Sequence, residues 1–144
     1  MSRSLSFSMD VILISHIVCC FLMTGVIWVI QLVHYPSFKY IDEGQFADFA
    51  KFHAARISLI VLPLMLVEII SALYLLDQHS WGIYNLSGVV LIWISTFLLS
   101  VPCHNKLQKG KDNSLINRLV ITNWPRTFLW SMRSVFFTWF ILQS

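Results

Sequence analysis

The stretch VILISHIVCCFLMTGVIWVIQLV, residues 11–33, decides the fold, and residues 81–103 repeat its character. Neither stretch contains an Asp, Glu, Lys or Arg residue. Both meet the length of about 20 apolar residues that a helix needs to cross a bilayer. Two further apolar stretches are interrupted only by Glu68 in residues 57–76 and by two arginines in residues 124–142. The sequence therefore predicts four membrane-spanning helices.

The overall composition supports the same prediction. Of 144 residues, 57% are hydrophobic and only 12% are charged, whereas soluble domains average about 25% charged residues. The mean hydropathy is +0.71, which excludes an ordinary soluble domain. We predict an all-α fold, an integral membrane four-helix bundle. We expect one transmembrane domain over residues 1–144, after a short polar tail, with spans at about 10–35, 56–77, 81–103 and 123–142.

Residues 37–56 mix aromatic and charged side chains. Phe46 and His53 fall on one side of a helical wheel, and charged residues fall on the other. This pattern predicts an interfacial amphipathic helix between spans 1 and 2. We expect the first span to end before Pro36, because proline disfavours helix at the preceding residue. Pro63 should bend the second span, since it removes a backbone hydrogen bond.

Lysine and arginine are concentrated in two segments, 34–56 and 104–126, while the 77–86 loop has none and the tail has only Arg3. Because short cytoplasmic loops carry an excess of Lys and Arg, we predict a multi-pass protein of the bacterial inner (cytoplasmic) membrane with both termini outside. The net charge of +3 then reflects topology, and no nucleic-acid partner is expected. The expected partners are membrane lipids and a small lipophilic substrate, with a homo-oligomer left open.

Each span carries a thin stripe of polar side chains at 100° per residue. The stripes are richest at the ends that an antiparallel bundle brings together on the cytoplasmic side. Polar groups are costly in lipid, so such a convergence marks a candidate site. The predicted substrate contacts in these stripes are Gln31, Tyr35, Arg56, Asn123, Arg126 and Trp130.

Three histidines, His34, His53 and His104, fall near one membrane depth. Imidazole is the commonest protein ligand for transition metals, so the trio predicts an iron, copper or zinc ion, or a haem. The spacing matches no recognised metal motif, and the alternative is that the rings simply form hydrogen bonds at the interface. His16 and His79 lie toward the outer side, have no evident partners and are interpreted as incidental.

Glu68 is the deepest charged residue of its span. A lone carboxylate there would cost several kcal/mol or become protonated, and Arg133 in the last span is its natural partner. The pair is either structural, fixing helix register, or catalytic, with Glu68 as the proton acceptor. Asn123 and Arg126, at a predicted helix start, suit an anionic or carbonyl oxygen. Contact between Arg126 and a lipid phosphate is the equal alternative.

Several linked motifs carry a family resemblance. They are Trp28-x-x-Gln31-x-x-His34-Tyr35-Pro36-x-Phe38, Phe52-His53, Pro63-x-Met65-x-x-Glu68, Val101-Pro102-x-His104-x-x-Leu107 and Asn123-Trp124-x-Arg126-Thr127-x-x-Trp130-x-x-Arg133. They resemble the motifs of an uncharacterised family of small bacterial four-span membrane proteins, which implies an architecture but no activity. The Asn123/Arg126 pattern is also similar to that of the anthrone oxygenase-like membrane family. That similarity implies substrate contacts at both residues and oxidation of polycyclic aromatic phenols to quinones.

Two main functional hypotheses follow. The first is a membrane oxidoreductase or oxygenase that acts on a lipophilic aromatic or quinone-like substrate, with the three histidines holding a metal or haem. The second is a small transporter or lipid/ligand-binding membrane subunit with Glu68 as the coupling carboxylate. The outer halves of the spans contain few polar residues, which favours a one-sided pocket over a transport path. A structural partner of a larger membrane complex is a third possibility.

Overall fold

The computed structural model describes residues 2–143, with side chains from residue 11 onward. The side chain of Arg3 therefore lies outside the described part. Every regular element in that part is helical, which confirms the all-α prediction. The elements are α1 (Ser2–Val29), η1 (Ile30–His34), α2 (Tyr35–Ser37), η2 (Phe38–Tyr40), α3 (Glu43–Leu75), α4 (Gly82–Ser95), η3 (Thr96–Ser100), α5 (Val101–Leu107) and α6 (Asn113–Gln143).

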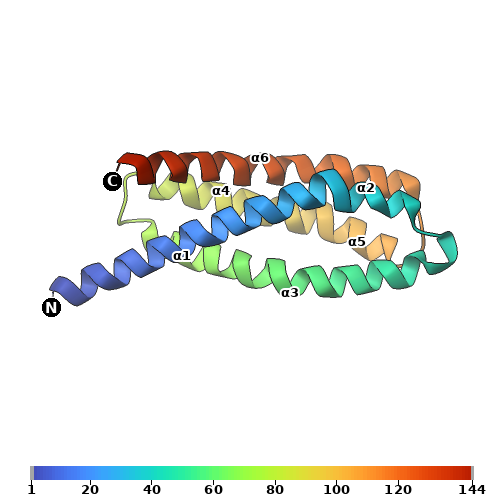
Figure 1. Ribbon diagram of the computed structural model, residues 1–144, viewed down its shortest axis with the longest axis horizontal. Coiled ribbons are helices and arrows are strands. Elements are labelled where there is room, and N and C mark those ends of the chain that lie inside the picture. Colours follow the sequence, from blue (N-terminus) through green and yellow to red (C-terminus); the bar gives the residue numbers. More distant parts are fainter. Residues whose placement is uncertain (1, 144) are drawn as a thin grey trace.

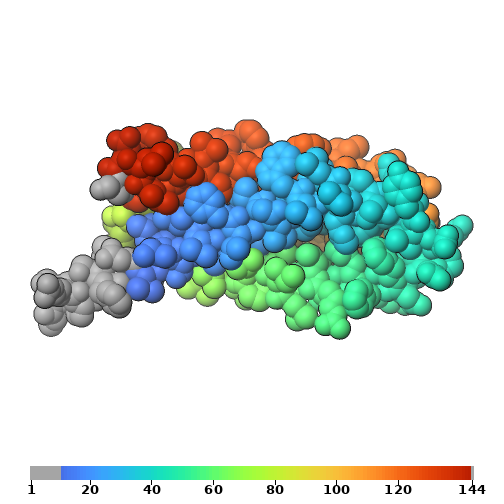
Figure 2. Space-filling view, in the orientation of Figure 1, coloured from blue at the N-terminus to red at the C-terminus, as the bar shows by residue number. Residues whose placement is uncertain are grey.

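Consecutive elements join into four long helical rods that lie side by side (Figure 1). The α1 rod packs against α3 and α6, and α4 packs against the same two helices from the opposite corner. Figure 2 shows α1 lying across the face between α3 and α6. The chain termini lie at one end of the molecule and the α2–α3 and α5–α6 connections at the other, here called the loop end.

Three of these rods are long and apolar enough to cross a membrane: Val11–Tyr40, Glu43–Leu75 and Gly82–Leu107. The fourth, α6, has a more polar composition, with Asn123, Arg126 and Arg133 along its length.

The first rod continues through Pro36 to Tyr40 instead of ending before the proline. The third rod likewise continues through Pro102. In each rod a π-helical segment, η1 or η3, ends two residues before the proline. A proline inside an α-helix clashes with the carbonyl four residues earlier, and the wider π-turn accommodates it. The same segments carry polar residues of the candidate site.

The predicted interfacial helix does not form a separate element: residues 43–56 begin the continuous helix α3, and residues 37–42 lie in α2, η2 and the connection that follows. Phe46 and Ala50 are buried in the core at the loop end, where they pack with Phe38, Leu107 and Leu119.

The last helix also begins earlier than expected, at Asn113 instead of residue 123, and runs on through Pro125. Asp112 caps it by accepting hydrogen bonds from the backbone N–H groups of Ser114 (2.8 Å) and Leu115 (3.1 Å). Lys111 donates to the carbonyls of Lys39 (2.9 Å) and Ile41 (2.7 Å) and so ties the two connections of the loop end together.

Candidate functional site

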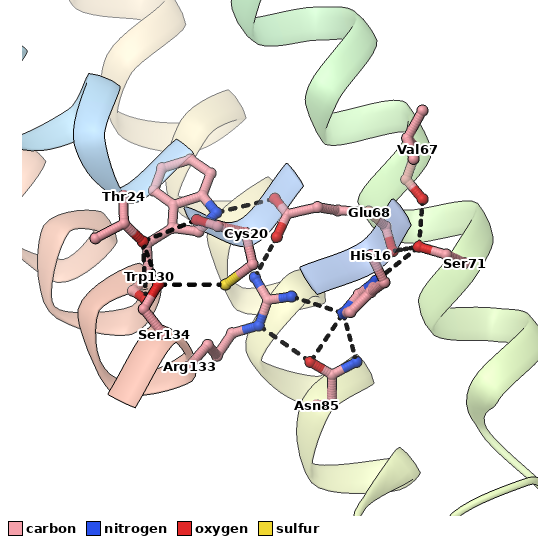
Figure 3. Close-up of polar contacts among 10 residues, drawn as sticks. All are labelled: His16, Cys20, Thr24, Val67, Glu68, Ser71, Asn85, Trp130, Arg133 and Ser134. Carbon is pink, nitrogen blue, oxygen red and sulfur yellow. Dashed lines mark hydrogen bonds and ion pairs between the residues drawn. The ribbon is translucent and has the colours of Figure 1, made fainter. Parts of the chain in front are cut away.

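A buried ion pair lies at the centre of a polar network in the half of the molecule nearer the termini (Figure 3). Arg133 Nη1 lies 2.7 Å from Glu68 Oε1, which confirms the predicted pairing. The other carboxylate oxygen accepts a hydrogen bond of 2.9 Å from the indole Nε1 of Trp130. The carboxylate is thus held from two positions on α6.

His16 and Asn85 complete this network. Arg133 Nε donates to Asn85 Oδ1 at 3.1 Å, and Arg133 Nη2 lies 3.0 Å from His16 Nε2. The other ring nitrogen, His16 Nδ1, lies 2.6 Å from Ser71 Oγ. Each rod therefore contributes at least one side chain. The buried network is defined here as His16, Glu68, Ser71, Asn85, Trp130 and Arg133.

The interpretation of His16 as incidental was wrong, since its side chain is fully buried in the network. The available signal was its spacing from Cys20, Met23 and Ile27, which places it on the core stripe of the first helix. Asn85 was also missed. Gly88, one turn further along α4, leaves room for Arg133, because a Cβ there would lie 3.2 Å from Arg133 Cδ.

No polar side-chain atom of the buried network is buried without a partner. Fully partnered polar groups rigidify a core and specify one arrangement of it. The geometry of Glu68 and Arg133 therefore fits the structural alternative, and their catalytic role stays a prediction.

A second polar cluster joins η1, η3 and α6 nearer the loop end. Asn123 Nδ2 donates to Gln31 Oε1 at 2.7 Å, and Gln31 Nε2 donates to the carbonyl of Val120 at 3.1 Å. Arg126 donates from Nη2 to Asn123 Oδ1 and from Nη1 to Thr96 Oγ1, the latter at 3.4 Å. The predicted contacts Gln31, Asn123 and Arg126 thus form one buried group.

The three histidine rings also come together. His34 Nε2 lies 2.7 Å from His53 Nδ1, and the centroids of His53 and His104 are 5.5 Å apart. His104 Nε2 lies 3.0 Å from the hydroxyl of Tyr35. His53 Nε2 is buried without a hydrogen-bond partner.

This gathering does not form a metal centre in the described residues, where no three His, Cys, Asp or Glu side chains are placed to hold one ion. The reason is visible in the pairing: one nitrogen of His34 and one of His53 face each other, and His104 faces Tyr35. The metal or haem prediction gains no support from this geometry.

A cavity of about 190 Å³ lies between α1, α3, the third rod and α6. Its polar lining comprises Tyr35, Ser58, Trp93, Thr96, Ser100, His104, Arg126 and Trp130. Its apolar lining includes Met23, Ile27 and Met65. Four lining residues are exposed on the surface, and they mark an opening between α3 and the third rod: Ser58, Leu62, Phe97 and Val101.

Three polar atoms in the lining side chains are buried without a partner: Arg126 Nε, Trp93 Nε1 and Ser100 Oγ. Arg126 itself is only 6% exposed. Orphaned polar atoms are rare in folded proteins, and each calls for an explanation such as a bound molecule. Their concentration around one hollow makes the cavity the candidate binding site.

Arg56 and the His34–His53 pair face a different hollow. They line an apolar surface groove of about 510 Å³ between α1 and α3, beside Gly25 and Phe52. The structure therefore separates Arg56 from the cavity, while Tyr35, Arg126 and Trp130 line it.

Comparisons with protein-family models, curated proteins and solved structures find no match. The two family resemblances stay predictions, and the function is inferred from the geometry of the site.

The buried ion pair generates the first prediction. Glu68→Leu or Arg133→Leu alone should lower the free energy of unfolding by about 3–5 kcal/mol, because each leaves an uncompensated buried charge. The double variant should cost much less than the sum. Denaturation of the purified protein in detergent measures all three. Asp48→Leu, which breaks the exposed 3.6 Å ion pair with Lys51, is the control and should cost at most about 1 kcal/mol. Additive single effects would contradict the coupling.

The orphaned atoms generate the second prediction. Ser100→Ala should leave the free energy of unfolding unchanged or raise it, because the ligand-free protein loses only an unsatisfied hydroxyl. Ser134→Ala is the matched control, since its buried hydroxyl lies 2.7 Å from Thr24 Oγ1. That substitution should cost about 1 kcal/mol. A larger loss for Ser100→Ala than for Ser134→Ala would mean that the Ser100 hydroxyl is satisfied.

Proposed function

We propose that the chain is an integral membrane four-helix bundle that binds a small lipophilic ring compound in the cavity. The proposal that the chain spans a membrane is supported by the apolar side chains on the outer surface of the rods. Large apolar side chains are exposed along every rod, for example Val33 at 64%, Leu59 at 68%, Leu98 at 68% and Val135 at 70%. A soluble monomer rarely exposes contiguous apolar surface on this scale, whereas lipid covers it favourably.

The same argument extends to α6, whose composition alone does not identify it as a span. Its polar residues Asn123, Arg126 and Arg133 are buried, and its exposed surface carries Phe128 and Trp139 among other apolar side chains. Intramembrane polar residues generally face a bundle interior. We therefore propose α6 as the fourth span.

The proposed orientation places the loop end in the cytoplasm of a bacterial cell, with both termini outside. The basic side chains of Lys39, Lys109 and Lys111, which lie in the connections of the loop end, support it, as does Lys106 in the last turn of α5.

The proposed ligand is defined by the cavity. Its volume of about 190 Å³ compares with the roughly 150 Å³ of an engineered cavity that binds benzene, so one substituted ring fits. The opening at Leu62 and Phe97 faces the proposed lipid side, which suits entry from the bilayer. The single observation that carries the proposal is the set of orphaned atoms on Arg126, Trp93 and Ser100, which would meet an oxygen-bearing ring such as a phenol or quinone.

Ligand binding is the part of the predicted functions that the site supports best. An oxidoreductase would add electron transfer, and the Tyr35–His104 pair beside the cavity offers a proton donor or acceptor for it. The transporter alternative draws on a different observation. A further hollow of about 320 Å³ between α4 and α6 is lined by Asn85 and Arg133 of the buried network, and Trp130 of the same network lines the cavity. The outer halves are therefore less poor in polar groups than the sequence indicated.

Blocking the opening tests the proposed site. The probe is 4-ethylphenol, and binding should raise the unfolding temperature of the purified protein, since a ligand stabilises the state that binds it. Ser58→Phe should abolish that rise by filling the opening. Ser87→Phe is the matched control, because Ser58 and Ser87 are both exposed and both bond to the carbonyl four residues earlier, at 2.7 and 2.8 Å. Equal binding by both variants would place the probe elsewhere.

Labelling of intact cells with a membrane-impermeant maleimide tests the orientation. The exposed positions Gln78 and Lys109 lie in connections at opposite ends of the rods, and the three native cysteines are buried. Gln78→Cys should react in intact cells, and Lys109→Cys only after permeabilisation. The reverse pattern would invert the topology, and labelling of both in intact cells would contradict a membrane-spanning arrangement.

A further inference from the structure

We infer that the ring compound is held as an anion, through a carboxylate or phenolate oxygen on Arg126; this inference rests on the proposed function. Arg126 lines the cavity and is buried. Its protein partners are neutral: the amide oxygen of Asn123 and the hydroxyls of Thr96 and Tyr35. No carboxylate of the described residues lies within ion-pair distance of it, because the ion pairs there are Arg133–Glu68 and Lys51–Asp48.

Arg133 shows what a fully compensated buried arginine requires in this fold. Its guanidinium lies 2.7 Å from the Glu68 carboxylate and contacts His16 and Asn85 as well. Arg126 lies seven residues earlier on the same helix. It is also buried, but no carboxylate lies beside it to balance its charge. An uncompensated buried charge is strongly unfavourable. A negatively charged ligand would therefore compensate the charge of Arg126, as the Glu68 carboxylate compensates that of Arg133.

The orphaned atoms in the cavity lining favour the same class of ligand. Arginine Nε and tryptophan Nε1 carry hydrogens and only donate, and the Ser100 hydroxyl can donate as well. An ionised carboxylate or phenolate oxygen only accepts hydrogen bonds. Bonds to an ionised acceptor are also about twice as strong as bonds between neutral groups. A cavity rich in unused donors next to an unpaired cation therefore selects an aromatic acid over its neutral analogue.

The experiment compares two probes of nearly the same shape, 4-ethylbenzoate and 4-ethylbenzamide, by calorimetric titration of the detergent-purified full chain near neutral pH. The wild-type protein should bind the benzoate at least tenfold more tightly. Arg126→Gln should remove this preference while leaving amide binding, and Arg126→Lys should retain part of the preference. Arg118→Gln, an exposed arginine on the same helix, is the matched control and should keep the full preference.

The outcomes distinguish two claims: that the cavity binds a ring compound, and that this compound is bound as an anion. If the amide binds as tightly as the benzoate, or if Arg126→Gln keeps the preference, the anion inference is overturned and the proposed ring-binding function stands. If neither probe nor 4-ethylphenol binds, the proposed function itself fails. The wild-type comparison requires no substitution, so it remains decisive even where an Arg126 variant does not fold.

Discussion

The pairing of Glu68 with Arg133 is the interaction on which the arrangement of the rods depends. Two charges removed from water must be compensated by each other and by further hydrogen bonds. Here the further partners, His16, Asn85 and Trp130, come from three different rods. The pair consequently fixes the rods relative to one another, because sliding any one of them would leave a buried charge or a polar atom without its partner.

With register fixed in one half, the other half can hold polar groups that are not fully satisfied. Arg126 and Arg133 lie about 10 Å apart along α6 at 1.5 Å per residue, yet their surroundings differ. Arg133 has a carboxylate, and Arg126 has neutral partners and one orphaned nitrogen. Trp130, between them, bonds to Glu68 and lines the cavity, so it joins the part of the core that stabilises the fold to the part that we propose binds a ligand.

The sequence was enough to predict those features that follow from the free-energy cost of burying polar and charged side chains. The helical rods, the Glu68–Arg133 pair and the meeting of the histidines near Tyr35 all follow from that cost and from antiparallel packing. The role of His16 was not predicted, because this residue lies inside an uncharged apolar stretch, where a single polar residue is easily interpreted as incidental. The separate interfacial helix did not form, because Phe46 and Ala50 pack into the core and an aromatic stripe fits a core as well as a membrane surface. The metal prediction depends on ring orientation, which spacing does not encode; one nitrogen each of His34 and His53 face each other and His104 Nε2 faces Tyr35, so the prediction gains no support.

The two π-helical segments have a consequence for how the chain tolerates change in length. Each wide turn holds one residue more than a regular turn would, so everything beyond it is rotated by roughly 100° relative to an uninterrupted α-helix. Excising a single residue from η1 would swing Tyr35 away from the shared interior, and the same deletion in η3 would displace His104. His16 and Asn85, which precede η1 and η3 in their own rods, would keep their places in the buried network. The one extra residue in each of η1 and η3 therefore decides whether Tyr35 and His104 face the interior of the bundle. The buried network does not decide this.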